Sequence, residues 1–168
     1  MDLLIVDGYN MIGAWPELIE LKKKDLEAAR DRLVELLAEY RGFTGTEVIV
    51  VFDAYYVKGR GKKYRNYKLE IIYTKENETA DERIEKLAKQ RVSRRTKVYV
   101  ATSDFTEQWA IFGQGAYRKS ARELYNDIME IKKGIQSNVK KIQENRPTSK
   151  IPLSDEVLDY FEKLRRGK

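Results

Sequence analysis

Two residue types with broad chemical use, cysteine and histidine, are absent from the 168 residues of the chain. The absence of cysteine excludes disulfide bonds, thiolate nucleophiles and cysteine-based zinc sites. The absence of histidine excludes acid–base catalysis by an imidazole, and with it Ser-His-Asp and Cys-His arrangements. Any catalysis must therefore use carboxylates, lysine, tyrosine, hydroxyl groups or a metal ion with oxygen ligands, which favour Mg²⁺ or Mn²⁺.

Long apolar runs are missing as well, since no stretch approaches the roughly 20 residues that a membrane-spanning helix needs. The N-terminus lacks the basic and then apolar pattern of a signal peptide. Acidic residues number 27 against 33 Lys and Arg, and the net charge of +6 favours an anionic partner such as nucleic acid. We expect one soluble, cytoplasmic domain over residues 1–168, without a membrane partner.

Short apolar runs alternate with helical patterns along the chain. The patterns predict strands at 2–6, 47–55, 67–74 and 97–104, and helices at 26–40, 78–90, 118–144 and 154–165, with a short helix or turn at 105–115. Thr79 and Glu82 have the spacing of a capping box at a helix start. This alternation predicts an α/β fold with a mainly parallel sheet covered by helices.

Carboxylates follow several of the predicted strands. Asp7, Asp53 and Asp104 each come at a strand end, and the carboxyl ends of parallel strands share the edge where ligands bind. Asp81, in the first turn of the helix at 78–90, can point along the same edge. Each aspartate alone could be a helix cap, a turn residue or a partner of the helix dipole. Together, such carboxylates repel one another unless a cation or a basic partner lies among them.

The first strand runs into the sequence "DGYN". Here Gly8 is expected to let a phosphate backbone approach closely, and the Asn10 amide to orient a carboxylate, a water or a phosphate. Tyr9 could stack on a base or pack in the core. No nucleotide cofactor is expected: residues 14–15 are Ala and Trp where a phosphate-binding loop needs Lys and Ser or Thr, and Asn10 replaces the second glycine of the dinucleotide pattern.

Two basic segments are candidates for RNA contact. The segment 58–68 interleaves positive charge with tyrosine, which suits phosphate contact and base stacking, although it could be a solvated connection between strands. In the segment 116–122, basic residues follow the strand that ends at Asp104, although they could form an ordinary helix surface. The candidates are Lys58, Arg60, Lys62, Lys63, Tyr64, Arg65, Lys68, Arg118, Lys119 and Arg122. We interpret residues 92–97 as a solvated turn at the opposite end of the sheet, and Trp15 and Trp109 as packing residues.

Four segments resemble the YacP-like branch of the NYN nucleases, relatives of the PIN domain: "VDGYNMIGAW", "VVFDAY", "TKENETADERIEKL" and "ATSDFTEQWAIFGQGAYRKSARE". The resemblance covers nearly the whole chain. It implies a three-layer α/β/α PIN-like fold with a helical C-terminal segment, and a divalent-metal nuclease. It carries the metal and catalytic roles onto Asp7, Asp81 and Asp104, with Asn10 and Asp53 near that site. It extends to ribosome-associated endoribonucleases of Gram-positive bacteria, which cut mRNA on translating ribosomes.

The leading hypothesis is a Mg²⁺- or Mn²⁺-dependent endoribonuclease that cuts mRNA, with the ribosome as a partner and the A site as the place of cutting. One alternative is a non-catalytic RNA- or ribosome-binding module on the same fold. Another is a metal-dependent phosphatase of small molecules, which fits the acidic edge but leaves the basic segment 58–68 unexplained.

Overall fold

The computed structural model describes residues 1–54, 63–66, 68–103, 110–144 and 163–165. Its contacts divide the chain into two compact units, Met1–Lys132 and Lys133–Lys168. The first unit contains the sheet and the candidate site, and the second is described at residues 133–144 and 163–165, which are helical. A single domain over 1–168 stays a prediction. No helix in the described part of the chain is long and apolar enough to cross a membrane.

The first unit is built on a six-stranded sheet with the order β3-β4-β2-β1-β5-β6. The strands are β1 (Asp2–Asp7), β2 (Glu47–Phe52), β3 (Lys63–Asn66), β4 (Leu69–Tyr73), β5 (Lys97–Thr102) and β6 (Tyr117–Ser120). All neighbouring pairs are parallel except β3 and β4, which are antiparallel. The predicted mainly parallel sheet is confirmed, and β1 lies in its interior between β2 and β5.

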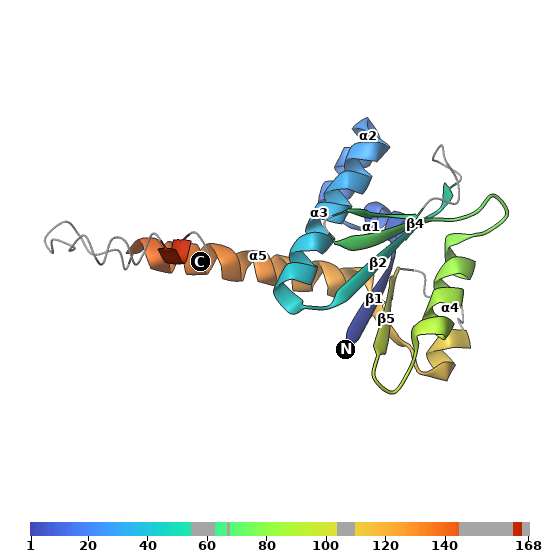
Figure 1. Ribbon diagram of the computed structural model, residues 1–168. Coiled ribbons are helices and arrows are strands. Elements are labelled where there is room, and N and C mark those ends of the chain that lie inside the picture. The colour runs from blue at the N-terminus through green and yellow to red at the C-terminus, as the bar shows by residue number, and fades with distance from the viewer. Residues whose placement is uncertain (55–62, 67, 104–109, 145–162, 166–168) are drawn as a thin grey trace, which may run out of the picture. The chain divides into compact units, whose positions relative to one another are not determined.

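Helices cover both faces of the sheet, which makes the fold a three-layer α/β/α arrangement (Figure 1). One face packs against α1 (Gly8–Ala14), α2 (Pro16–Lys24), α3 (Leu26–Thr44) and the first turns of α5 (Ala121–Glu144). The other face packs against α4 (Ala80–Arg91) and the short 3-10 helix η2 (Ala110–Gln114). Alternate residues of β1 serve the two layers, since Leu4 faces the first core and Ile5 the second. Burial on both faces explains the nearly continuous apolar strands.

Capping residues fix two of the predicted helices. The hydroxyl of Thr79 accepts a hydrogen bond from the backbone N–H of Glu82 over 3.1 Å, so the predicted start of α4 is confirmed. Asp25 caps α3 by accepting from the backbone N–H of Glu27 over 2.9 Å. Gly45 ends α3 with a left-handed φ of 74°, which a residue without a side chain adopts without strain.

The structure departs from the predicted elements in three places. Helices α1 and α2 and strand β3 lie in stretches for which the sequence pattern predicts no element. The predicted helix start at Arg118 is wrong, because residues 117–120 form β6 and α5 begins at Ala121. A side-chain cap marks that boundary: Ser120 Oγ accepts from the Glu123 N–H over 3.0 Å and donates to Glu123 Oε1 over 3.1 Å.

Candidate active site

The carboxyl edge of the sheet brings together residues that are far apart in the sequence. Asp7 is the last residue of β1 and pairs with Val51 of β2, so Asp53 follows β2 at the same edge. Helix α4 leads from the end of β4 back to the start of β5, which places Asp81 in its first turn at this edge. Asp104 follows β5 in the sequence and lies outside the described residues.

The carboxylate of Asp7 is buried, with 3% of the residue exposed. Asp7 stands at the N-cap position of α1, but its side chain makes no capping hydrogen bond. Instead, Asp7 Oδ2 accepts from Asn10 Nδ2 over 2.6 Å, and Asn10 Oδ1 accepts from the hydroxyl of Ser103. Helix capping therefore does not account for Asp7, and the amide of Asn10 orients its carboxylate.

Gly8 has a structural role in the core. A Cβ added at Gly8 would overlap the ring of Phe52, so the glycine makes room for that side chain, while the close approach of a phosphate stays a prediction. Tyr9 packs on the same ring, with the two centroids 5.2 Å apart, and its hydroxyl accepts from Arg30 Nη1 over 3.3 Å. These contacts favour the packing alternative for Tyr9 over base stacking.

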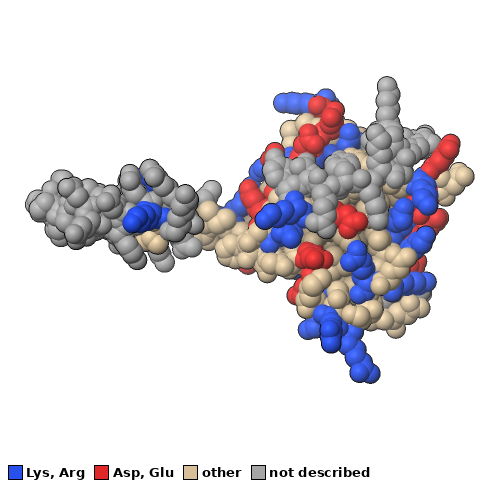
Figure 2. Space-filling view, in the orientation of Figure 1, with Lys and Arg blue, Asp and Glu red and all other residues tan. Residues whose placement is uncertain are grey.

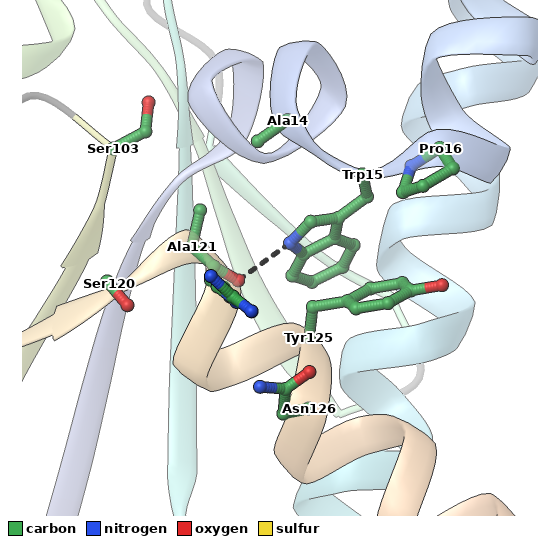
Figure 3. Close-up of a pocket in the computed structure, with 9 residues that line it drawn as sticks. Ala14, Trp15, Pro16, Ser103, Ser120, Ala121, Tyr125 and Asn126 are labelled. Carbon is green, nitrogen blue, oxygen red and sulfur yellow. Dashed lines mark hydrogen bonds between the residues drawn. The ribbon is translucent and has the colours of Figure 1, made fainter.

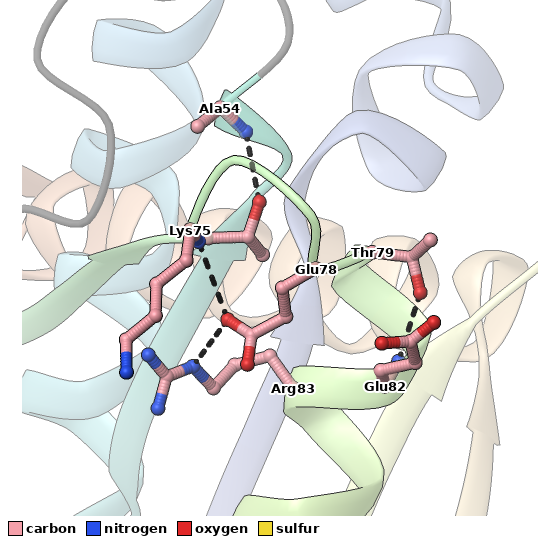
Figure 4. A network of polar contacts seen from close by, with 7 residues as sticks. Ala54, Lys75, Glu78, Thr79, Glu82 and Arg83 are labelled. Carbon is pink, nitrogen blue, oxygen red and sulfur yellow. Dashed lines mark hydrogen bonds and ion pairs between the residues drawn. The ribbon is translucent and has the colours of Figure 1, made fainter.

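The turn between β4 and α4, which positions Asp81, is held by a network of polar contacts (Figure 4). Buried Thr74 accepts from the backbone N–H of Ala54, the residue after Asp53, over 3.0 Å. Glu78 accepts from the backbone N–H of Lys75 over 3.3 Å and from Arg83 Nε over 2.9 Å. The network ties the end of β2 to the start of α4.

The candidate metal ligands supply oxygen donors alone, because the chain has no histidine or cysteine. Across the described residues, no three acidic side chains lie close enough together to hold an ion. Mg²⁺ commonly uses one or two protein carboxylates, completing its shell with waters and substrate phosphates. Buried Asp7, with its carboxylate fixed by Asn10, fits that donor chemistry.

The chain matches one known protein family over nearly its whole length. A profile of the YacP-like NYN domain family matches residues 4–166. The chain belongs to this family. It is 60% identical over 167 residues to "Uncharacterized protein YacP" of Bacillus subtilis (strain 168), covering 99% of this chain and 98% of that protein.

Two crystal structures of that YacP-like family resemble the chain over its length. The structure of Rae1 (YacP) from Bacillus subtilis matches with a TM-score of 0.76 and 60% identity, covering 99% of this chain and 96% of that one. A Trp-to-Leu point mutant of the same protein matches with a TM-score of 0.76, 57% identity and the same coverage. The PIN-like fold is thereby confirmed, and the NYN family is a nuclease-type, PIN-related class.

In this YacP-like NYN chain, the basic segment 58–68 is described only in part. Lys63, Tyr64 and Arg65 belong to β3, the edge strand that pairs with β4, and Lys68 follows as an exposed residue with a φ of 66°. Lys58, Arg60 and Lys62 lie outside the described residues. Among the described residues, basic and acidic side chains are mixed on the face shown in Figure 2.

The three basic residues of the segment 116–122 lie in different environments. The guanidinium of Arg118 lies over the ring of Phe112, 4.6 Å from its centroid. Lys119 Nζ lies 2.5 Å from Asp127 Oδ2 on α5. Burial lowers the pKa of Lys119, but the hydrogen bond to Asp127, together with the contributions of Tyr40 and of the Asp127 charge, outweighs it, and the pKa lies above its usual value. The third residue, Arg122, is exposed and lines a pocket.

That pocket, of about 550 Å³, was not predicted from the sequence (Figure 3). Three separate stretches of chain form it: Ala14, Trp15, Pro16, Ser103, Ser120, Ala121, Arg122, Tyr125 and Asn126. Trp15 packs as expected, being 2% exposed with its indole N–H donating to the carbonyl of Ala121 over 2.9 Å. Trp109 lies outside the described residues. Ser103 joins the pocket to the Asn10–Asp7 pair.

Proposed function

We propose that this chain is a divalent-metal-dependent endoribonuclease that cuts mRNA, and that the ribosome presents the mRNA to it. The observation that carries the proposal is the buried Asp7 carboxylate at the end of an interior strand. A carboxylate in that position costs folding free energy, and here it caps no helix but is held in one orientation by Asn10. Membership of a nuclease-type family supports a metal-binding role for this carboxylate.

The proposed ion is Mg²⁺ or Mn²⁺, held by Asp7, Asp81 and Asp104, with Asp53 nearby. When bound, such an ion supplies Lewis-acid stabilisation of the phosphate and lowers the pKa of an attacking water. Asp7 contributes a carboxylate whose direction is fixed before RNA arrives, through the chain of hydrogen bonds from Ser103 to Asn10 to Asp7. No imidazole is available as a base, and the expected products carry a 3′-hydroxyl and a 5′-phosphate.

Presentation by the ribosome follows from the need to position the phosphate. Cleavage rates depend steeply on the geometry of the attacked group. The contacts described at the carboxyl edge join protein groups to one another and not to RNA. In the segment 116–122, Arg118 lies on the ring of Phe112 and Lys119 pairs with Asp127. A ribosome would hold the mRNA in place, and its RNA would offer a docking surface for a chain of net charge +6.

The test is cleavage of end-labelled mRNA on stalled ribosomes by purified wild-type chain and by Asp7→Asn, Asp81→Asn and Asp104→Asn. Each variant is expected to abolish cleavage while its melting temperature holds or rises. Asp31→Asn, on the exposed side of α3, is the matched control and should cut normally. Normal cutting by a variant would remove that residue from the site. Tight ribosome binding without any cutting by the wild type would favour the binding-module alternative.

A further inference from the structure

The pocket beside the start of α5 adjoins the candidate active site without belonging to it. Its wall residue Ser103 is also the donor to Asn10, which in turn holds Asp7. The last residue of β6, Ser120, pairs with Thr102 at the end of β5, so the pocket opens at the same carboxyl edge as Asp7. A ligand in this pocket would therefore lie next to the carboxylate that is proposed to act on RNA.

Several groups in the pocket wall are already engaged. The indole N–H of Trp15 donates to the carbonyl of Ala121, and the buried indole ring packs against Tyr125 with centroids 5.8 Å apart, so the half-buried ring of Tyr125 is the one held ready for a ligand (Figure 3). The hydroxyl of Ser120 accepts from the backbone N–H of Glu123 and donates to its carboxylate, so it caps the first turn of α5. These contacts hold the wall of the pocket in place before any ligand binds.

The polar groups that can reach a ligand come from one face of α5. Arg122 and Asn126 are both exposed and lie one helical turn apart, with Tyr125 beside them. A guanidinium donates hydrogen bonds and stacks on flat rings, while a side-chain amide offers both a donor and an acceptor. Tyr125, backed by the buried indole of Trp15, gives the site an aromatic wall next to these polar groups.

We propose that this pocket binds one base of single-stranded RNA, that of a nucleotide flanking the phosphate to be cut; this rests on the proposed function. Unpaired bases are bound by stacking on aromatic rings or guanidinium planes and by hydrogen bonds to their edges. The pocket provides both kinds of contact, and its volume of about 550 Å³ lies in the range of small-ligand sites. Occupying it would fix the RNA next to Asp7.

The indole N–H of Trp15 provides a specific signal for the test. The chain has two tryptophans, so a ¹⁵N-labelled sample gives two indole signals, and a Trp109→Phe variant assigns the one from Trp15. The full chain is titrated with uridine and adenosine 5′-monophosphates and with ribose 5-phosphate, each up to about 20 mM, since single nucleotides are expected to bind with a Kd of roughly 1 mM. We expect the nucleotides to shift the Trp15 signal and ribose 5-phosphate to leave it unchanged.

Variants then assign the binding to the pocket. Arg122→Gln and Asn126→Ala are each expected to weaken nucleotide binding by about five-fold or more, the effect of losing one hydrogen bond. Arg94→Gln removes the same charge from the turn at the opposite end of the sheet and should bind as the wild type does. The proposal is overturned if no nucleotide shifts the Trp15 signal, if ribose 5-phosphate shifts it equally, or if both variants bind normally. A chain that binds bases here but cuts no RNA would refute the proposed function and leave the pocket assignment standing.

Discussion

The side-chain amide of Asn10, in the first turn of α1, donates to Oδ2 of Asp7, the last residue of β1, over 2.6 Å. The carboxylate and the group that orients it are therefore three positions apart in the sequence. Asn10 is itself held by Ser103 from the end of β5, so the direction of Asp7 depends on a neighbouring strand as well.

Removing the side chains that orient the Asp7 carboxylate is predicted to slow cleavage without unfolding the chain. Groups that position a metal-binding side chain typically contribute 10- to 100-fold, so Asn10→Ala should lower the cleavage rate by about that factor. Ser103→Ala should lower the rate by up to about ten-fold, because Asn10 still reaches Asp7 directly. Single-turnover cleavage across a range of Mg²⁺ concentrations is the measurement. Gln90→Ala removes an exposed side-chain amide near the end of α4, at the opposite edge of the sheet, and should leave the rate unchanged.

Gly8→Ala separates two explanations of the glycine. If the residue makes room for Phe52, the added methyl group should destabilise the fold by about 1–3 kcal/mol, and Phe52→Leu in the same chain should recover part of the loss. Urea unfolding measures both. Gly42→Ala is the control, since nothing lies within 4 Å of its added Cβ and alanine favours the helix. Unchanged stability together with lost cleavage would instead support close approach of a phosphate.

Local patterns in the sequence predict much of the sheet and the placement of Asp7 and Asn10 at its carboxyl edge. Apolar runs gave β1, β2, β4 and β5, and the strand-end position of Asp7 with Asn10 nearby follows from the chain itself. Ser120 and Glu123 have capping-box spacing, which indicates the true start of α5. The apparent helical period of the residues before them predicts an earlier start, which is wrong.

The remaining features depend on contacts between distant segments. Gly8 meets Phe52 through packing of α1 on β2, which no short stretch of sequence encodes. Ser103 reaches Asn10 across 93 positions, and the pocket joins residues 14–16 to the first turns of α5. Register and packing decide such contacts, and a single sequence contains neither directly.

The pair of Lys119 and Asp127 is predicted to stabilise the fold more than it serves RNA. The raised pKa of Lys119 means that its contribution is fully present below the usual value of 10.5 and is lost as pH rises through the higher folded-state pKa. Lys119→Gln should cost about 1 kcal/mol of unfolding free energy near neutral pH, and the difference from wild type should shrink above about pH 10.5. Urea unfolding at several pH values measures this. A difference that grows with pH would contradict the assignment, and Lys89→Gln, exposed on α4, is the control.

The segment 58–68 is predicted to contact RNA through its charge. Replacing Lys62, Lys63 and Arg65 together with Ala should weaken RNA binding and reduce the slope of log K against log salt by about 2, since each contact with a single strand contributes roughly 0.7. Binding titrations at several salt concentrations give the slope. An unchanged slope would mean that the segment is solvated and does not touch the RNA.

Asp7 is proposed to act on mRNA that the ribosome presents, and one cleavage time course tests both parts of this proposal. Wild-type chain and Asp7→Asn are compared on the same labelled mRNA in three states: free, on a stalled ribosome with an empty A site, and on a ribosome with an occupied A site. Because ribosomes themselves need Mg²⁺, the variant rather than metal removal serves as the inactive control. We expect the wild type to cut only the mRNA on the ribosome with the empty A site, and Asp7→Asn to cut none of the three. Equal cutting of the free transcript would contradict presentation by the ribosome, and equal cutting by Asp7→Asn would contradict the proposed active site.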